Sequence, residues 1–219
     1  MGAVIRVLLV DDDPLVRSAL SLMLGGQRDI EVVGEASNGE EGLDLVTELE
    51  PDVVLMDIRM PVMDGLEATQ ALHQRPSPPH VVVLTTFDAD DHVLQAIASG
   101  ADGFLLKDTP PGDIVSAIRT VDAGDAMLSP SATRSLVSRL RSTTSSDRVS
   151  TAADRLTVLT ERELEVAVCV GRGLSNSEIA TELYLSVPTV KSHVSRLLTK
   201  LDSTNRVQVA MVVHDAGLV

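Results

Sequence analysis

Val4-Ile5-Arg6-Val7-Leu8-Leu9-Val10-Asp11-Asp12-Asp13 is a nearly continuous apolar run that ends on three aspartates. Three later apolar runs each end on one polar side chain: Val53–Met56 on Asp57, Val81–Leu84 on Thr85, and Phe104–Leu106 on Lys107. Short runs of this kind, separated by helical patterns, are typical of strands in a parallel sheet buried on both faces. In such a sheet, ligands bind outside the carboxyl ends of the strands. The sequence therefore predicts a crevice surrounded by carboxylates, a hydroxyl and an ammonium group.

The first 125 residues alternate strand and helix patterns five times. Strands are expected near residues 4–10, 30–34, 53–57, 81–85 and 103–106, and helices near 14–25, 39–49, 65–74, 89–99 and 112–123. This alternation predicts an α/β domain with a doubly wound, five-stranded parallel sheet. Because crossovers between parallel strands are right-handed, the expected strand order is 2-1-3-4-5.

The composition excludes a membrane-spanning protein. Of the 219 residues, 44% are hydrophobic, and no run approaches the roughly 18 apolar residues of a membrane helix. The N-terminus does not resemble a signal peptide, because Arg6 and the acidic triplet interrupt it. A single cysteine, Cys169, excludes an internal disulfide and suits a reducing compartment. We expect a cytoplasmic protein with no membrane partner.

Charge divides the chain into two parts. Residues 1–125 contain 7 Lys and Arg against 23 Asp and Glu, whereas residues 126–219 contain 11 against 9. An acidic module is thus joined to a mildly basic one, although the net charge of the whole chain is −14. Only the second module can approach DNA without strong repulsion.

The second module is predicted to be helical. We expect a linker over residues 126–155, with a helix near 129–141 followed by a flexible stretch over 142–151, and then an all-α domain over 156–219. Two capping boxes, Thr160-x-x-Glu163 and Ser175-x-x-Glu178, open its first two helices. Ser186 is expected to cap the third helix, and Thr204 the fourth, which Gly217 ends. A four-helix module fits these signals.

The residues of the acidic crevice suit phosphoryl chemistry. Mg²⁺ takes about six oxygens, of which one or two are usually carboxylates, and Asp11, Asp12 and Asp57 can supply them. Asp57 ends the central strand and is the natural nucleophile. Lys107 and Thr85 can neutralise or hydrogen-bond the phosphoryl oxygens. Asp13, just before Pro14, is expected to be only a helix cap.

The segments around these residues resemble the receiver domain of bacterial response regulators over roughly residues 3–123. The matching segments are Val10-Asp11-Asp12-Asp13-Pro14, Leu55-Met56-Asp57-Ile58-Arg59-Met60-Pro61-Val62-Met63-Asp64-Gly65, Leu84-Thr85-Thr86 and Gly103-Phe104-Leu105-Leu106-Lys107-Asp108. The resemblance implies a flavodoxin-like fold, with Asp57 as the phosphorylated residue. It also implies that Asp12 binds Mg²⁺ directly, Asp11 largely through water, and Arg59 through its backbone carbonyl. Thr85 and Phe104 fall on the family's switch positions, where Phe104 lacks the hydroxyl of the more common tyrosine.

Residues 176–201 have the size and spacing of a helix-turn-helix. On the second helix Val190, Val194, Leu197, Leu198 and Leu201 recur at helical spacing and are expected to face the core. Residues near the start of a recognition helix reach base edges, whereas long cationic side chains hold phosphates. Lys191 and Ser192, with Ser195 behind them, are the predicted base contacts. The full set of predicted DNA contacts is Val190, Lys191, Ser192, His193, Ser195, Arg196, Lys200 and Arg206.

The helical module resembles the LuxR-type DNA-binding domain. The resemblance lies in Leu159-Thr160-Glu161-Arg162-Glu163, Gly173-Leu174-Ser175-Asn176-Ser177-Glu178-Ile179-Ala180 and Thr189-Val190-Lys191-Ser192-His193-Val194. Together with the receiver, it identifies a NarL/FixJ-type response regulator. Ser177 stands where the family often has lysine, so DNA affinity is expected to depend more on dimerisation over paired half-sites.

The sequence thus predicts a transcriptional regulator rather than an enzyme. The expected partners are a sensor histidine kinase, double-stranded DNA, a second copy of the phosphorylated chain and RNA polymerase, and the expected cofactor is Mg²⁺. One alternative is an aspartyl phosphatase or hydrolase, which would need a second acid two residues after Asp57, where the chain has Arg59. The other alternative is a regulator that binds DNA independently of phosphorylation.

Overall fold

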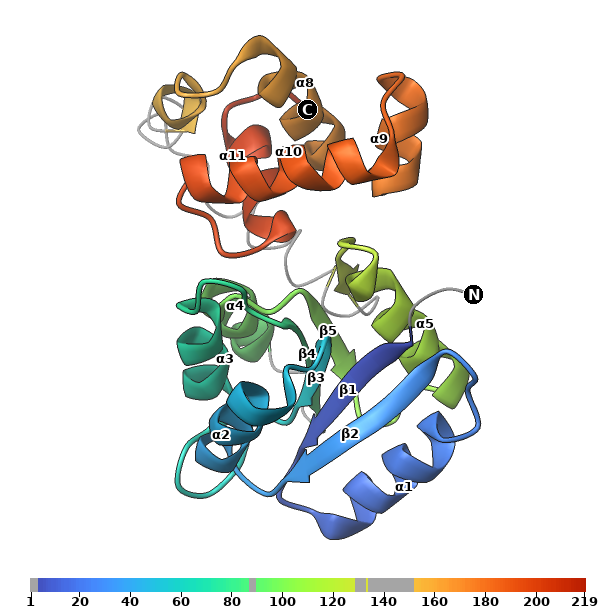
Figure 1. Cartoon of the computed structure of the whole chain (residues 1–219). Coiled ribbons are helices and arrows are strands. Elements are labelled where there is room, and N and C mark those ends of the chain that lie inside the picture. The colour runs from blue at the N-terminus through green and yellow to red at the C-terminus, as the bar shows by residue number, and fades with distance from the viewer. Residues whose placement is uncertain (1–3, 87–89, 129–132, 134–151) are drawn as a thin grey trace. The chain divides into compact units, whose positions relative to one another are not determined.

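A computed structural model describes residues 4–86, 90–128, 133 and 152–219 of the chain (Figure 1). These residues fall into two compact units. The first comprises the described residues up to Ala123 with Met127, Leu128 and Thr133, and the second comprises Gly124–Ala126 with residues 152–219. The predicted helix near 129–141 and the flexible stretch over 142–151 lie almost entirely outside the described residues. No helix in the described part of the chain is long and apolar enough to cross a lipid bilayer.

The first unit is a parallel sheet between two layers of helices (Figure 1). Its strands are β1 (Ile5–Val10), β2 (Ile30–Ala36), β3 (Val53–Met56), β4 (His80–Thr85), β5 (Gly103–Leu106) and β6 (Met127–Leu128). Its helices are α1 (Pro14–Leu24), α2 (Gly39–Leu49), α3 (Gly65–His73), α4 (Asp90–Ser99) and α5 (Pro111–Asp122). The sheet order is β2-β1-β3-β4-β5-β6, which confirms the predicted doubly wound order and adds a short sixth strand.

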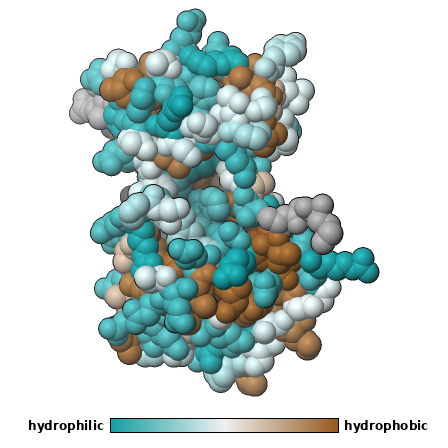
Figure 2. All heavy atoms as spheres, viewed as in Figure 1, coloured by the Kyte–Doolittle hydropathy of each residue, from teal (hydrophilic) through white to brown (hydrophobic). Residues whose placement is uncertain are grey.

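The alternating side chains of the strands supply both faces of the core. Val7 and Leu9 of β1 pack with Leu20 and Leu24 of α1 and with the apolar face of α5. The next residues along β1, Leu8 and Val10, are also buried, so the strand is apolar on both sides. By contrast, β2 lies at the sheet edge and is only half-buried over much of its length. Hydrophobic surface is accordingly visible in Figure 2 where β2 forms the edge of the sheet.

The second unit contains helices α8 (Glu161–Gly171), α9 (Asn176–Glu182), α10 (Val187–Lys200) and α11 (Arg206–Asp215). Residues 152–156 form a further helical segment, whose Ala152 and Leu156 belong to the same buried cluster as the four helices. Both predicted capping boxes are present, and Ser186 caps α10. The predicted cap of the last helix was wrong by one residue, because Asn205 rather than Thr204 accepts the N–H of Gln208 at 3.0 Å.

Candidate functional site

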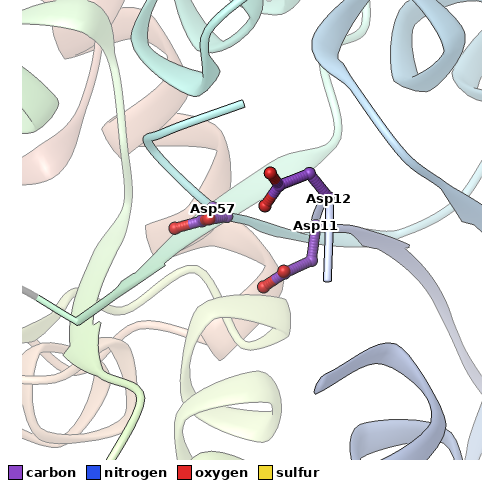
Figure 3. Close-up of side chains that lie close together, drawn as sticks. All are labelled: Asp11, Asp12 and Asp57. Carbon is purple, nitrogen blue, oxygen red and sulfur yellow. The ribbon is translucent and has the colours of Figure 1, made fainter. Parts of the chain in front are cut away.

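Three aspartates meet at the carboxyl edge of the sheet. Asp11 and Asp12 follow β1 and Asp57 follows β3, and these strands are direct neighbours with Val10 opposite Met56. Their ligand oxygens lie within 4.8 Å of one another (Figure 3). Asp11 and Asp57 are buried, whereas Asp12 is exposed. The cluster therefore combines two desolvated carboxylates with one that remains open to solvent.

Lys107 links the two buried carboxylates. Its Nζ lies 2.6 Å from Oδ2 of Asp11 and 3.0 Å from Oδ2 of Asp57. The lysine reaches them because it follows β5, and its backbone N–H is fixed by the carbonyl of Thr85 at the end of β4. The remaining oxygen of Asp57 accepts the backbone N–H of Ile58 at 2.8 Å. Both oxygens of the predicted nucleophile are thus held in place by donors.

Burial and charge act in opposite directions in this site. Burial raises the pKa of Asp57, and the contact with Lys107 only partly offsets that effect. Burial alone would lower the pKa of Lys107, but its hydrogen bonds to Asp11 and Asp57 outweigh the burial and raise it. Two buried carboxylates sharing one ammonium leave an excess of negative charge, which a divalent cation bound by oxygen ligands can neutralise. The donor set therefore fits Mg²⁺.

The predicted switch residues lie on β4 and β5, the two strands that follow β3 in the order of the sheet. Thr85 ends β4 and is 2% exposed, and Phe104 on β5 is fully buried. Arg59 lines an open pocket of about 670 Å³ beside the aspartates, together with Asp12, Ile58, Met60, Pro61, Asp64, Leu66, His92 and Gln95. Asp13 caps α1 by accepting the N–H of Leu15 at 2.8 Å, which confirms its predicted role. The structure thus brings together Asp11, Asp12, Asp57 and Lys107. The side chain of Asp13 instead caps α1.

Gly65 is a residue of this site whose role the sequence reasoning missed. It begins α3, and a Cβ placed on it would lie 1.8 Å from the carbonyl oxygen of Asp57. Its backbone N–H donates to the carbonyl of Ile58 at 2.8 Å. The start of α3 therefore lies directly against the peptide that carries Asp57. The sequence Asp64-Gly65 at the start of a helix was a possible signal, because glycine permits such a close approach.

Most of the predicted DNA contacts lie on the exposed face of α10. Lys191, Ser192, Ser195 and Arg196 are exposed, and His193 is half-buried with its Nδ1 buried and unpartnered in the structure. Val190 is fully buried in the helical core, so the prediction that it contacts DNA is wrong. Val190 is buried because it lies on the apolar stripe of α10, which packs into the helical core.

Lys200 lies at the end of α10 and pairs with Glu163 of the first capping box. The distance from Nζ to Oε2 is 2.7 Å. The hydrogen bond from Lys200, followed by that from the backbone of Thr160, lowers the pKa of Glu163 to about 2. Lys200 therefore joins α10 to the start of α8, and its predicted contact with a DNA phosphate stays a prediction.

We expect Glu163→Gln to change how the stability of the second unit depends on pH. A pKa lowered from 4.5 to about 2 on folding stabilises the folded state above pH 4.5, and this contribution is lost as the pH falls toward 2. The variant should be less stable than wild type at neutral pH, and the difference should shrink below pH 4.5. Hydrogen exchange of the α8 amides in the variant and in the wild type, compared at equal pH, measures this difference in stability. Glu161→Gln, an exposed position in the same helical turn, is the control and should show no such trend.

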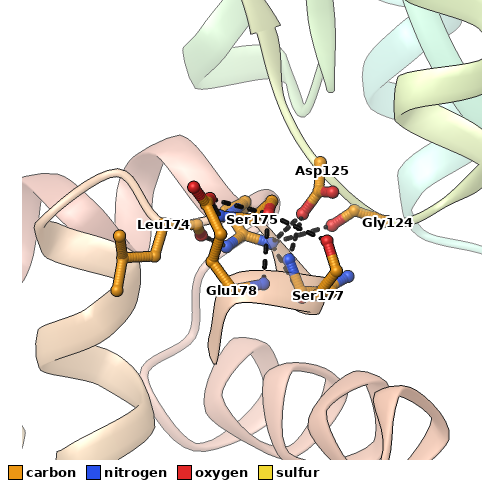
Figure 4. A network of polar contacts seen from close by, with 8 residues as sticks. Gly124, Asp125, Leu174, Ser175, Ser177 and Glu178 are labelled. Carbon is orange, nitrogen blue, oxygen red and sulfur yellow. Dashed lines mark hydrogen bonds and ion pairs between the residues drawn. The ribbon is translucent and has the colours of Figure 1, made fainter. Parts of the chain in front are cut away.

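Arg206 was predicted to contact DNA but lies buried at the start of α11, with 9% of its surface exposed. Its Nη1 donates to the side chains of Asp125 at 2.8 Å and Asn176 at 2.9 Å, and to the carbonyl of Gly124 at 3.1 Å. Its Nη2 donates to the carbonyl of Leu174. Figure 4 shows this network at the start of α9, beside the capping box of Ser175 and Glu178. In this structure Arg206 binds protein acceptors, and its contact with DNA stays a prediction.

Comparison with known proteins assigns both units. The response regulator receiver domain family matches residues 7–119, and the LuxR family of bacterial regulatory proteins matches residues 157–213. The chain is 42% identical to the transcriptional regulatory protein LiaR of Bacillus subtilis over 98% of this chain and 99% of LiaR. It is 38% identical to the nitrate/nitrite response regulator NarL of Escherichia coli K12 over 95% of this chain and 94% of NarL.

A solved structure supports the same assignment. The response regulator ChrA of a heme-sensing two-component system matches all of this chain and all of its own, with a TM-score of 0.54 and 34% sequence identity. Each of these three proteins aligns with this chain over nearly its whole length, and so across both units. The chain therefore belongs to the NarL-type two-component response regulators, which are transcription regulators built from a receiver domain followed by a LuxR-type DNA-binding domain.

Proposed function

We propose that this regulator is switched by Mg²⁺-dependent phosphorylation of Asp57 by a sensor histidine kinase. The observation that carries the proposal is the cluster of Asp11, Asp12 and Asp57 with Lys107 within hydrogen-bond distance of two of them. Within the described part of the chain, no other group of three or more acidic, histidine or cysteine side chains could hold a metal ion. A phosphoacceptor needs a nucleophile, a cation site and a fixed positive charge, and these residues provide all three.

In the proposed reaction, an oxygen of Asp57 forms a bond to phosphorus while the bond from phosphorus to the donor histidine nitrogen breaks. Asp11, Asp12 and the backbone carbonyl of Arg59 would hold Mg²⁺, which neutralises charge on the phosphoryl oxygens when bound. The backbone N–H of Ile58 orients the attacking carboxylate, and Lys107 contributes its positive charge beside it. Arg59 stands where a hydrolase would need its second acid. Asp57 therefore accepts a phosphoryl group but does not serve as the nucleophile of a hydrolase that turns over external substrates.

The added phosphoryl group carries about −1.5 to −2 charges. Lys107 lies close enough to pair with it, and the hydroxyl of Thr85 is the proposed hydrogen-bond donor from β4. Phe104 is already fully buried on β5 and lacks a hydroxyl of its own. The movement that reports phosphorylation is therefore assigned to Thr85. Phosphorylation shifts the equilibrium only by its differential stabilisation of the active state.

The output is proposed to be dimerisation and binding of paired DNA half-sites in the cytoplasm, with RNA polymerase as a further partner. Lys191, Ser192, Ser195 and Arg196 form the exposed face of α10 that would enter the major groove. One module with so few cations binds weakly, whereas two linked modules gain through effective concentration. A dimer therefore supplies the affinity that Ser177 at the start of α9 does not.

The test is a selection of DNA fragments by the full chain with and without beryllofluoride and Mg²⁺, where beryllofluoride mimics the phosphoryl group. We expect enrichment of paired half-sites about one helical turn apart only when the mimic is present. The dissociation constant of the chain for the selected DNA fragments should be at least about ten-fold lower with the mimic than without it. Equal enrichment in both conditions would instead identify a regulator that binds DNA independently of phosphorylation.

A further inference from the structure

We infer that Arg17 is a positioning residue of the cation site, where its guanidinium fixes the peptide that joins Asp11 to Asp12. This inference rests on the proposed function, in which Asp11 and Asp12 hold Mg²⁺. The two aspartates follow β1 and are drawn in Figure 3, and Arg17 lies near the start of α1. All three residues belong to the first unit.

The guanidinium of Arg17 reaches the backbone of the acidic cluster. Its Nη1 donates to the carbonyl oxygen of Asp11 at 2.5 Å. This carbonyl belongs to the planar peptide whose nitrogen is that of Asp12, so one hydrogen bond restrains the rotation of the peptide between two predicted ligands. The side chain of Arg17 is only 17% exposed, so water competes little for this bond. Arg17 therefore sets the direction in which both carboxylates leave the chain.

Glu35 holds the guanidinium from the edge strand β2. Nε of Arg17 lies 3.3 Å from Oε2 of Glu35. The residue after Glu35, Ala36, accepts the backbone N–H of Asp11 at 3.1 Å. The edge strand thus fixes Asp11 twice, directly through the sheet on one side of the residue and through Arg17 on the other side.

The geometry of the guanidinium and its charge have opposite effects on a bound cation. A guanidinium is planar and donates from several nitrogens, so Arg17 pairs with Glu35 and with the carbonyl of Asp11 at the same time. An ammonium group on a flexible stem is not oriented by two acceptors in this way. The positive charge by itself repels a cation in the neighbouring site. A positioning role therefore predicts weaker cation binding when Arg17 is removed, whereas a role through charge alone predicts tighter binding.

The test measures binding of Mn²⁺, which takes octahedral oxygen sites like those of Mg²⁺. The full chain is titrated, the electron paramagnetic resonance of free Mn²⁺ gives the dissociation constant, and Asp12→Asn identifies the binding that belongs to this site. We expect Arg17→Gln to raise the constant about ten-fold, because groups that orient metal ligands commonly contribute this much to affinity. Arg17→Lys keeps the charge and a donor, and should raise the constant by less. Arg28→Gln, at an exposed position before β2, is the charge-matched control and should change it less than about two-fold.

Glu35→Gln tests the same arrangement without replacing Arg17. The variant removes the charge that pairs with Nε, so the guanidinium is held less firmly and the dissociation constant for Mn²⁺ should rise. Glu31→Gln, an exposed position on the same strand, is its control and should change the constant less than about two-fold. Glu35 is itself exposed, so this variant remains informative if Arg17→Gln does not fold.

A residue that only stabilises the fold would lower the urea midpoint of the metal-free chain and leave the Mn²⁺ affinity of the folded chain unchanged. The inference is therefore overturned if folded Arg17→Gln binds Mn²⁺ as tightly as the wild type or more tightly. If Arg17→Gln does not fold, equal constants for Glu35→Gln and Glu31→Gln overturn it.

Either of these results would leave the proposed function intact, provided that the wild type binds Mn²⁺ and is labelled by phosphoramidate. If the wild type shows no Mn²⁺ binding that Asp12→Asn removes, the proposed function fails and the inference fails with it. A higher constant in Arg17→Gln and in Glu35→Gln than in their controls supports the inference.

Discussion

Asp57→Asn is expected to abolish incorporation of acid-labile phosphate from a kinase or from a small phosphodonor. The amide that replaces the carboxylate is not a nucleophile. In the wild type, the two carboxylate oxygens accept from Lys107 and Ile58, and the amide keeps only one such oxygen. Labelling of the full chain with phosphoramidate and Mg²⁺, followed by mass measurement at neutral pH, detects the product. The loss should be complete within detection, because the substitution removes the proposed nucleophile and leaves no carboxylate at position 57.

Asp13→Asn is the matched control for that experiment. Asp13 belongs to the same acidic triplet, but its side chain caps α1 by accepting the N–H of Leu15. Asparagine caps helices about as well as aspartate, so labelling should continue at a rate near that of the wild type. Undiminished labelling of Asp57→Asn would show that another residue receives the phosphoryl group.

Gly65→Ala is expected to destabilise the first unit by about 3 kcal/mol or more and to impair phosphorylation. The new Cβ would lie 1.8 Å from the carbonyl oxygen of Asp57, and the atom it meets is backbone, which cannot rotate away. The start of α3 or the end of β3 must therefore move, and the end of β3 carries the nucleophile. Urea unfolding followed by circular dichroism gives the stability, and phosphodonor labelling gives the reactivity.

Gly112→Ala is the control for this substitution. Gly112 lies in the first turn of α5, and nothing lies within 4 Å of a Cβ added there. Alanine restricts the unfolded chain more than glycine does, so this variant should be equal to the wild type or more stable by about 0.4–1 kcal/mol. Wild-type stability in Gly65→Ala would contradict the close approach of α3 to Asp57.

The sequence predicted the sheet and its acidic edge from local patterns. Strand ends are visible as apolar runs that stop at Asp11, Asp57, Thr85 and Lys107, and parallel strands bring their carboxyl ends to one edge. The order of the first five strands was confirmed, but the sixth strand was missed. Met127–Leu128 is too short to show a period, and it becomes a strand only by pairing with β5.

The helical module shows where local patterns stop being informative. Its capping boxes were confirmed because the interacting residues lie three positions apart, Thr160 with Glu163 and Ser175 with Glu178. Thr204 and Asn205 are both competent caps, and the sequence does not choose between them. The choice follows from which residue can turn its side chain to Gln208 once α11 has packed.

The sequence by itself determined the class of each domain, the edge of the sheet that carries the candidate site, and the residue types gathered there, because these depend on short-range periodicity and on the geometry common to all parallel sheets. Only the tertiary structure decided which partners each polar side chain has. Lys107 pairs with Asp11 and Asp57, and Arg206 pairs with Asp125, 81 residues earlier. Such pairings depend on long-range packing and desolvation, which no local spacing encodes. For this reason Arg206, which was predicted to be a surface cation, is buried in the structure.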